Sequence, residues 1–265
     1  MSAPNQIDPL SNLLALPGVA KECEVTLKAI DDLMWNRTVR RHQSALTPYT
    51  RRTAGFATAA LDGAQMPKDP TMEPEVSPMG SLSEQGLLVT AEADLQTLAF
   101  KTEPLKVLAR LHTFASNDGD RGQPRISDDI DDPLRIGNVP PHRVLQERLA
   151  ALVDLIINSK APVILIAAIA HAELATLRPF TQGSYLVARA STRLILAARE
   201  VDVDGLVMSE YGAFLLGRPA YVKALSSYQS GTPDGVAAWI QWQGEAIRKG
   251  IEMALQLAEL ADVKK

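Results

Sequence analysis

The sequence has few of the residues from which disulfides and structural metal sites are built. It contains one cysteine, Cys23, and four histidines in 265 residues. A single cysteine excludes an internal disulfide and is typical of proteins in a reducing compartment, so we expect a cytoplasmic protein. Because the sequence has no Cys-x-x-Cys pair, we also expect no metal site.

Long apolar runs and an excess of positive charge are missing as well. The most apolar stretch, residues 161–170, has about half of the roughly 20 residues that a membrane span requires. The formal net charge is −4. This charge argues against a general nucleic-acid binder, because phosphate neutralisation needs clustered Lys and Arg. We therefore expect neither a membrane nor a nucleic acid as a partner.

Aromatic residues are also scarce, at 5%, and the apolar content comes mainly from Ala, Leu, Val and Ile. Within residues 140–159 the apolar positions Leu145, Leu149, Leu152 and Ile156 fall on one helical face. Similar patterns predict helices at about 19–46, 48–62, 103–116, 163–177 and 184–199, a short one within 217–230, and a long one from 233 onward. The fold class predicted is all-α.

Two segments do not follow the helical pattern. Residues 66–83 carry four prolines and are predicted to form a surface loop. Residues 117–139 are rich in Gly, Asp and Pro. We expect them to hold one short β-hairpin at most, near 124–139.

Residues 178–189 read Arg-Pro-Phe-Thr-Gln-Gly-Ser-Tyr-Leu-Val-Ala-Arg. They resemble the signature loop of the Fic family, His-Pro-Phe-x-Asp/Glu-Gly-Asn-Gly-Arg-x-x-Arg, whose members usually transfer AMP from ATP to a protein hydroxyl. The resemblance extends to His171-Ala-Glu-Leu before the loop, and to residues 217–221 and Trp239 after it. It implies a Fic-like helical core over residues 103–265, preceded by an additional helical region over residues 1–102.

The resemblance also implies that the family's catalytic residues are replaced in this chain. The family's base, metal ligand and phosphate-binding arginine correspond to Arg178, Gln182 and Leu186. A guanidinium stays protonated and cannot act as a general base, and a neutral amide is a poor ligand for a hard dication. None of the catalytic groups is therefore retained. We predict a degenerate Fic-domain protein that lacks AMP-transferase activity, needs no cofactor, and acts as a binding or regulatory module.

The resemblance also implies that part of the family's anion-binding site is retained. Ser184 and Tyr185 replace the family's Asn and Gly. Backbone N–H groups at a helix start bind anions without side-chain charge. The residues that are candidates for holding an anion or nucleotide are Arg178, Gly183, Ser184, Tyr185 and Arg189. We expect a protein partner or a small phosphate-bearing ligand, and a homo-oligomer is also compatible with the sequence.

An alternative is a divergent but active transferase that modifies a protein hydroxyl. It would use ATP and magnesium, with Arg178 on the phosphate and His171 as a relocated base. A histidine on such an apolar helix is more often a satisfied core residue, so this reading is weaker. A regulator of the toxin–antitoxin type is compatible with the implied fold but has no residue of its own to support it.

A second motif lies upstream, Thr58-Ala-Ala-Leu-Asp62-Gly63. It resembles the inhibitory segment of Fic proteins, Ser/Thr-x-x-x-Glu-Gly/Asn, whose Glu pairs with the second Arg of the loop in active relatives and blocks productive ATP binding. Here the matching pair is Asp62 and Arg189. The alternative is that Asp62 only ends its helix beside Gly63. We predict the pair, which requires the two side chains to lie within hydrogen-bond distance.

Overall fold

The computed structural model describes residues 8–117 and 119–263, and within these ranges every regular element is a helix. The all-α class is therefore confirmed. The elements are η1 (Ser11–Ala15), α1 (Val19–Trp35), α2 (Arg37–Asp62), α3 (Pro78–Leu95), α4 (Thr97–Phe100), α5 (Pro104–Ala115), η2 (His142–Val144), α6 (Leu145–Asn158), α7 (Val163–Leu177), α8 (Ser184–Ala198), α9 (Ser209–Leu216), α10 (Arg218–Gln229) and α11 (Pro233–Val263), where η marks a 3₁₀ helix.

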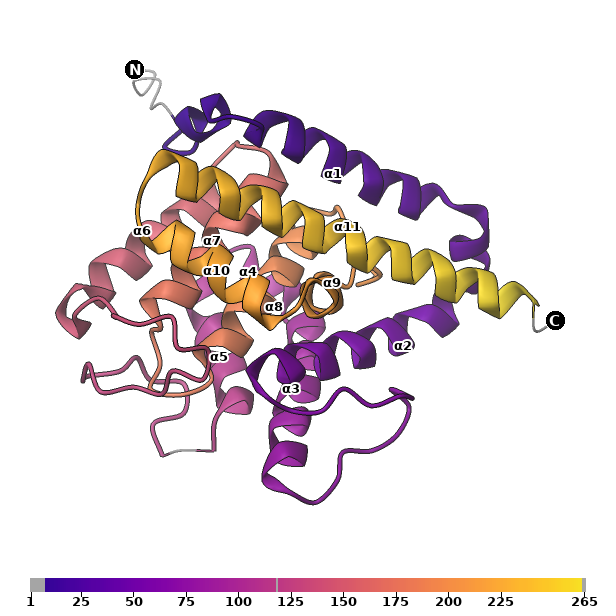
Figure 1. The fold of residues 1–265 in the computed structure, drawn as a ribbon, viewed down its shortest axis with the longest axis horizontal. Coiled ribbons are helices and arrows are strands. Elements are labelled where there is room, and N and C mark those ends of the chain that lie inside the picture. Colours follow the sequence, from indigo (N-terminus) through magenta and orange to yellow (C-terminus); the bar gives the residue numbers. More distant parts are fainter. Residues whose placement is uncertain (1–7, 118, 264–265) are drawn as a thin grey trace.

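Helices α7 and α8 form the centre of the molecule. Between Ile164 and Leu177 every residue except Glu173 is buried, and α8 is buried from Ser184 to Ala197. An apolar sequence on every face of a helix is typical of one surrounded by protein. Figure 1 shows α1 and α11 side by side along one edge of the molecule, with α2 and α3 packed together below them.

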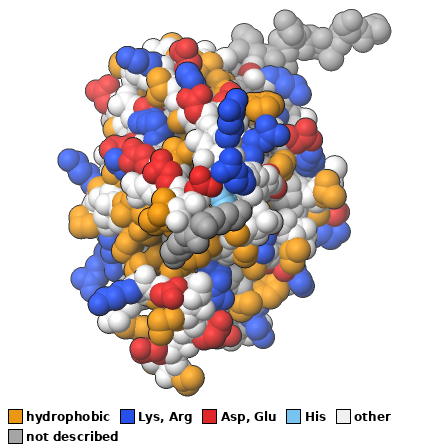
Figure 2. Space-filling model, turned by 90° about the vertical axis from the view of Figure 1, so that its right-hand side faces the viewer, with side chains coloured by type: hydrophobic (Ala, Val, Ile, Leu, Met, Phe, Trp, Pro, Cys, Tyr) orange, Lys and Arg blue, Asp and Glu red, His pale blue; other side chains and the backbone are white. Residues whose placement is uncertain are grey.

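The buried hydrophobic side chains form one cluster that runs from Leu10 to Ala258. Residues on both sides of the expected boundary at residue 103 contribute to it, and the division there stays a prediction. In the described ranges, no helix is both long and apolar enough to cross a membrane. Figure 2 shows positive and negative side chains interspersed over the face that it presents.

The boundary between the first two long helices differs from the expected one. The chain leaves the helix at Asn36, whose side-chain oxygen accepts hydrogen bonds from the N–H groups of Thr38 (2.9 Å) and Val39 (3.1 Å). Such a cap satisfies two donors that a new helix leaves without a partner. Pro48, where the break was predicted, lies inside α2. Capping chemistry, rather than the proline, therefore places the boundary.

The β-hairpin expected near 124–139 is absent, and residues 124–139, here called the flap segment, are irregular throughout. Their backbone groups bond elsewhere. The N–H of Arg125 donates to Pro179 O (2.8 Å) and that of Asp131 to Thr181 O (2.9 Å). The N–H of Gly137 donates to the Asp132 carboxylate (3.1 Å). Because these donors pair with loop 178–183 and with a side chain, they are not available for a strand ladder.

The surface loop predicted over 66–83 ends earlier than expected, because α3 begins at Pro78. Ser77 accepts a hydrogen bond from Gly80 N–H (3.0 Å), and Pro78 occupies the first turn. A serine followed by proline is a recognised helix start. Helices α3, α4 and α9 are not among the helices that the sequence pattern predicted.

Candidate functional site

Loop 178–183 joins α7 to α8 in a fixed backbone conformation. Arg178 ends α7 with φ 45°, and Gly183 precedes α8 with φ 68°. A Cβ at Gly183 would lie 2.5 Å from Ala115 O, so only glycine fits there. The Ser184 hydroxyl bridges the turn, accepting from Phe180 N–H and donating to Phe180 O, both at 3.0 Å. These contacts hold the loop that the sequence comparison singled out.

His112 of α5 ties this loop to Gly122, two residues before the flap segment. Its ring stacks on Phe180 at 3.9 Å between centroids. Nδ1 accepts from Gly122 N–H at 2.9 Å, so Nε2 carries the proton and donates to Gln182 O at 3.0 Å. His112 is not among the residues that the sequence singles out. Its only signal is a histidine on the buried face of a predicted helix.

Asp132, in the flap segment, is the second residue that the sequence did not indicate. Its carboxylate lies 2.9 Å from Arg178 Nη1 and accepts from the Tyr185 hydroxyl at 2.7 Å. Burial acts to raise the pKa of Asp132, but the bonds from Tyr185 and Gly137 N–H and the charge of Arg178 lower it overall. We call Asp132, Arg178 and Tyr185 the flap latch, because they join the flap segment to the start of loop 178–183 and to the first turn of α8.

The flap latch fills the start of α8 with protein side chains. Arg178 and Tyr185 are 1% and 2% exposed, and Arg178 also donates to Gly137 O. Burial, and the bond to Asp132, raise the pKa of Tyr185, so its hydroxyl keeps its proton. These are the positions at which the family has its histidine base and a small glycine. At the position of the family's base the chain therefore has a buried guanidinium, which cannot accept a proton.

The remaining substituted positions do not supply a metal site. The Gln182 side chain is exposed, and Leu186 is buried in the core. Among the described residues, no group of three or more His, Cys, Asp and Glu side chains is placed to hold a metal ion. The carboxylate of Asp132 is already bound by a guanidinium and a phenol. These residues do not fit a magnesium–nucleotide complex in this conformation.

Asp62 and Arg189 form the predicted pair. Arg189 Nη2 lies 2.6 Å from Asp62 Oδ2, and the guanidinium also donates to the Thr58 hydroxyl (2.6 Å) and to Thr58 O (3.0 Å). Both side chains are buried. Burial acts to lower the pKa of Arg189, and the Asp62 carboxylate raises it overall. Helix α2 ends beside Gly63, which has φ 122°. Asp62 is therefore the last residue of the helix, and its side chain also pairs with Arg189.

His171 faces the core. Its Nε2 lies 2.7 Å from the Tyr221 hydroxyl and its Nδ1 lies 3.3 Å from the Thr192 hydroxyl. The ring packs edge-on against Trp239 at 5.1 Å. Burial, with a smaller effect from the Arg189 charge, lowers the pKa of His171 to about 3. Both ring nitrogens are therefore engaged by core residues, and the side chain is 3% exposed.

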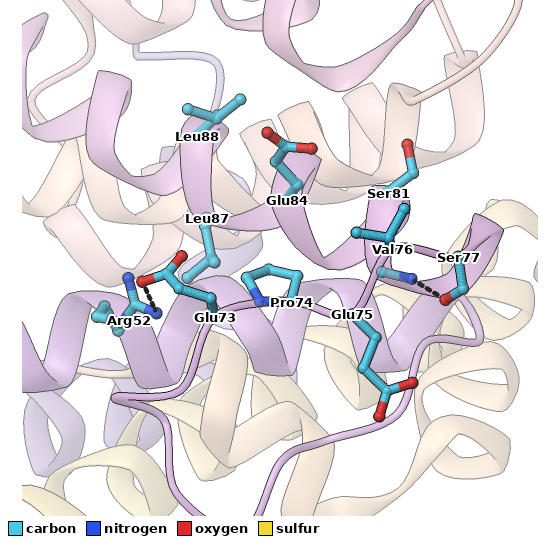
Figure 3. A pocket seen from close by; sticks show the side chains of 11 residues that line it. Arg52, Glu73, Pro74, Glu75, Val76, Ser77, Ser81, Glu84, Leu87 and Leu88 are labelled. Atoms are coloured by element: carbon cyan, nitrogen blue, oxygen red, sulfur yellow. Dashed lines mark hydrogen bonds and ion pairs between the residues drawn. The ribbon is translucent and has the colours of Figure 1, made fainter.

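A groove of about 500 Å³ lies away from this loop, between residues 73–77 and the first turns of α3. Figure 3 shows its carboxylates, Glu73, Glu75 and Glu84, and Arg52 from α2, which bonds to Glu73 at 3.3 Å. None of the predicted site residues lines this groove.

No family model matches the sequence, and no curated protein is similar to it. Solved structures of Fic family proteins are similar to the chain in fold. A Fic family protein from Desulfovibrio desulfuricans has a TM-score of 0.73 at 14% identity, over 91% of this chain and 75% of that chain. Fic-1 from C. elegans (residues 134–508) has a TM-score of 0.66 at 16% identity, over 92% and 73%.

A third structure, a Fic domain containing signalling protein from Bacteroides thetaiotaomicron, has a TM-score of 0.58 at 10% identity. That match covers 90% of this chain and 98% of the other. At such low identities the similarity concerns the fold. The chain therefore has the fold of Fic family proteins, as the resemblance of residues 178–189 implied.

Proposed function

We propose that this protein is a catalytically degenerate member of the Fic fold that does not transfer AMP and acts as a binding or regulatory module. The flap latch carries the proposal. Arg178 stands at the position of the family's base and is bound by Asp132, and Tyr185 at the helix start binds the same carboxylate. A guanidinium held in this way cannot accept the proton of an attacking hydroxyl.

The alternative of an active transferase with His171 as its base has less support. A general base must come within about 2.6–3.2 Å of the group that it deprotonates. His171 is buried, and its two nitrogens face Tyr221 and Thr192. A substrate hydroxyl would have to displace core side chains to reach it.

A small phosphate-bearing ligand is the ligand class that the site supports best. Among the described residues, no side chain caps the start of α8. Arg178 Nε and Arg189 Nη1 are buried, and neither has a hydrogen-bond partner within the described part of the chain. A guanidinium beside a helix N-terminus, as Arg178 is at the start of α8, favours an anion. A phosphate group would compete with Asp132 for Arg178, so binding would require the flap segment to open.

Calorimetric titration with ATP, with and without magnesium, tests the proposal when combined with labelling of acceptor proteins by α-³²P-ATP. We expect no metal-dependent binding and no label transfer by the unaltered protein. Metal-dependent binding together with label transfer would overturn the proposal.

A restored variant separates the loop from the scaffold. It combines Arg178→His, Gln182→Asp and Leu186→Arg, and a second version adds Tyr185→Gly and Ser184→Asn. Transfer by the second version only would show that Tyr185 and Ser184 close the site. Transfer by either version, and not by the unaltered chain, would show that these loop side chains account for the inactivity.

A further inference from the structure

A second cavity, of about 260 Å³, opens beside loop 178–183 on the side of α5. Helices α5, α6 and α7, the turn at residues 122–124 and the loop itself form its walls. The residues that line it are Leu105, Lys106, Leu108, Ala109, Gly122, Pro124, Leu149, Leu174, Pro179 and Phe180. We call it the α5 groove.

The chemistry of the α5 groove is that of a small-molecule site. Its floor consists of Leu108, Leu149, Leu174 and Phe180, each less than one-tenth exposed. Among the described residues that line it, Lys106 alone is charged. Ligand sites are mostly apolar with a few placed polar groups. An apolar cavity of about 150 Å³ is sufficient to bind benzene, so this larger groove has room for a longer apolar chain.

One end of the groove carries a basic side chain that is paired with an acidic one. Lys106 lies in the first turn of α5, which begins at Pro104, and a helix N-terminus carries partial positive charge. The Lys106 ammonium contacts Glu103 at 2.9 Å, but these side chains are 76% and 52% exposed. Exposed ion pairs contribute little to stability. The ammonium can therefore exchange this partner for the anionic group of a ligand.

The opposite end is apolar. Along α5, Ala109 lies about one turn beyond Lys106 and packs against Gly122, where an added Cβ would lie 3.2 Å from Ala109 O. His112, about one further turn along, stacks on Phe180. We propose that the α5 groove binds a small amphipathic carboxylate, with its anionic group at Lys106 and its apolar chain over Leu108 and Ala109 towards Phe180. This proposal does not depend on whether the protein transfers AMP.

The groove shares residues with loop 178–183, which gives the proposal a second measurable consequence. A ligand in it contacts Pro179 and Phe180. Pro179 O accepts the hydrogen bond from Arg125 of the flap segment (2.8 Å), and the Phe180 ring stacks on His112. Occupancy is therefore expected to slow hydrogen exchange in the flap segment as well as in α5.

The test is calorimetric titration of the full chain with decanoate below its micelle concentration, and with decan-1-ol as the uncharged probe. We expect one saturable site for decanoate. Lys106→Gln should weaken decanoate binding about three- to tenfold and leave decan-1-ol binding unchanged. Lys249→Gln is the matched control, because Lys249 also pairs with a glutamate three residues away, at 2.8 Å, and should change neither.

Ala109→Trp fills the groove and should abolish binding of both probes, with far-UV circular dichroism confirming that the variant is folded. If it does not fold, Leu105→Gln replaces it, since Leu105 is 42% exposed and should tolerate the change while weakening both probes. Absence of saturable decanoate binding, or binding that persists in the groove variants, would overturn the site. Equal effects of Lys106→Gln on both probes would overturn the carboxylate assignment.

Discussion

Arg178 and Tyr185 show that the replaced loop residues act together. Each occupies a position where the Fic signature has a different residue, and both bind the same carboxylate of Asp132 (2.9 and 2.7 Å). The two side chains therefore hold loop 178–183 and the start of α8 against the flap segment.

Arg189 and Asp62 lead to a prediction at the same scale. Replacing Asp62 by Ala leaves the guanidinium of Arg189 buried with its carboxylate removed. Breaking a buried pair in this way costs about 3–5 kcal/mol. Urea unfolding followed by circular dichroism should show this loss in the free energy of unfolding of Asp62→Ala.

The matched control is Asp32→Ala. Asp32 pairs with Lys28 at 2.7 Å, but both side chains are more than two-thirds exposed, so the change should stay below about 1 kcal/mol. Similar losses in the two variants would show that Arg189 does not need Asp62, and would remove the physical basis for an inhibitory-like pair.

At the scale of elements, side-chain contacts hold the flap segment in place. A β-hairpin would instead be held by backbone hydrogen bonds between its two strands. Asp132→Ala removes the acceptor for Arg178, Tyr185 and the N–H of Gly137. Loss of such bonds is worth roughly 2 kcal/mol, or about 30-fold in the local opening equilibrium. Hydrogen-exchange mass spectrometry should therefore show faster exchange in peptides from 124–139.

Exchange in the middle turns of α7 and α8 should remain unchanged in the same experiment, because Asp132 contacts these helices at Arg178, which ends α7, and at Tyr185, in the first turn of α8. Asp129→Ala, at an exposed position of the same segment, is the control and should leave the flap segment's exchange as it is. Equal exchange in the two variants would show that the latch does not hold the segment.

The sequence predicts an element well when the interactions that define its bounds lie between residues close together in the chain. The bounds 163–177 predicted for α7 agree with the structure, because an apolar run between a proline and a loop is a local signal. The boundary at Asn36 was missed because a cap competes with the proline signal at Pro48. The bond between Asp132 and Tyr185 joins residues 53 positions apart, and no local pattern indicates it.

The candidate site was predicted to a similar extent. A motif resemblance was sufficient to predict that Asp62 and Arg189 pair, although they are 127 positions apart. His112 and Asp132 were missed, because their roles arise only when the fold brings α5 and the flap segment against loop 178–183. The resemblance concerned the loop itself and gave no information on the side chains that pack against it.

At the scale of the whole molecule, the core joins its helices through buried charges. Arg193 of α8 contacts Asp94 of α3 at 2.5 Å and donates to Gly205 O at 3.0 Å. Asp202, in the turn after α8, accepts from the N–H groups of Leu206 and Val207, both at 2.9 Å. The packing of α3, α8 and the turn before α9 therefore depends on buried charged groups.

The buried carboxyl of Asp202 predicts how stability varies with pH. Burial raises its pKa to about 6 from an ordinary 3.8, although the Arg193 charge and the two backbone bonds lower it in part. The folded protein thus binds a proton more tightly than the unfolded chain. The contribution of Asp202 to the free energy of unfolding is fully present below about pH 4 and is lost as the pH rises through about 6, by up to about 3 kcal/mol.

Asp202→Asn removes this titration while keeping the size of the side chain and one acceptor. The free energy of unfolding of the variant minus that of the unaltered protein should therefore increase by about 2–3 kcal/mol between pH 4 and pH 7.5, measured by urea unfolding at each pH. Asp204→Asn in the same turn is the control, and because Asp204 is only half-buried its difference should change by less than about 1 kcal/mol. A difference for Asp202→Asn that stays constant with pH would show that this carboxyl is ionised in the folded core across the whole range, held so by Arg193 and the two backbone donors.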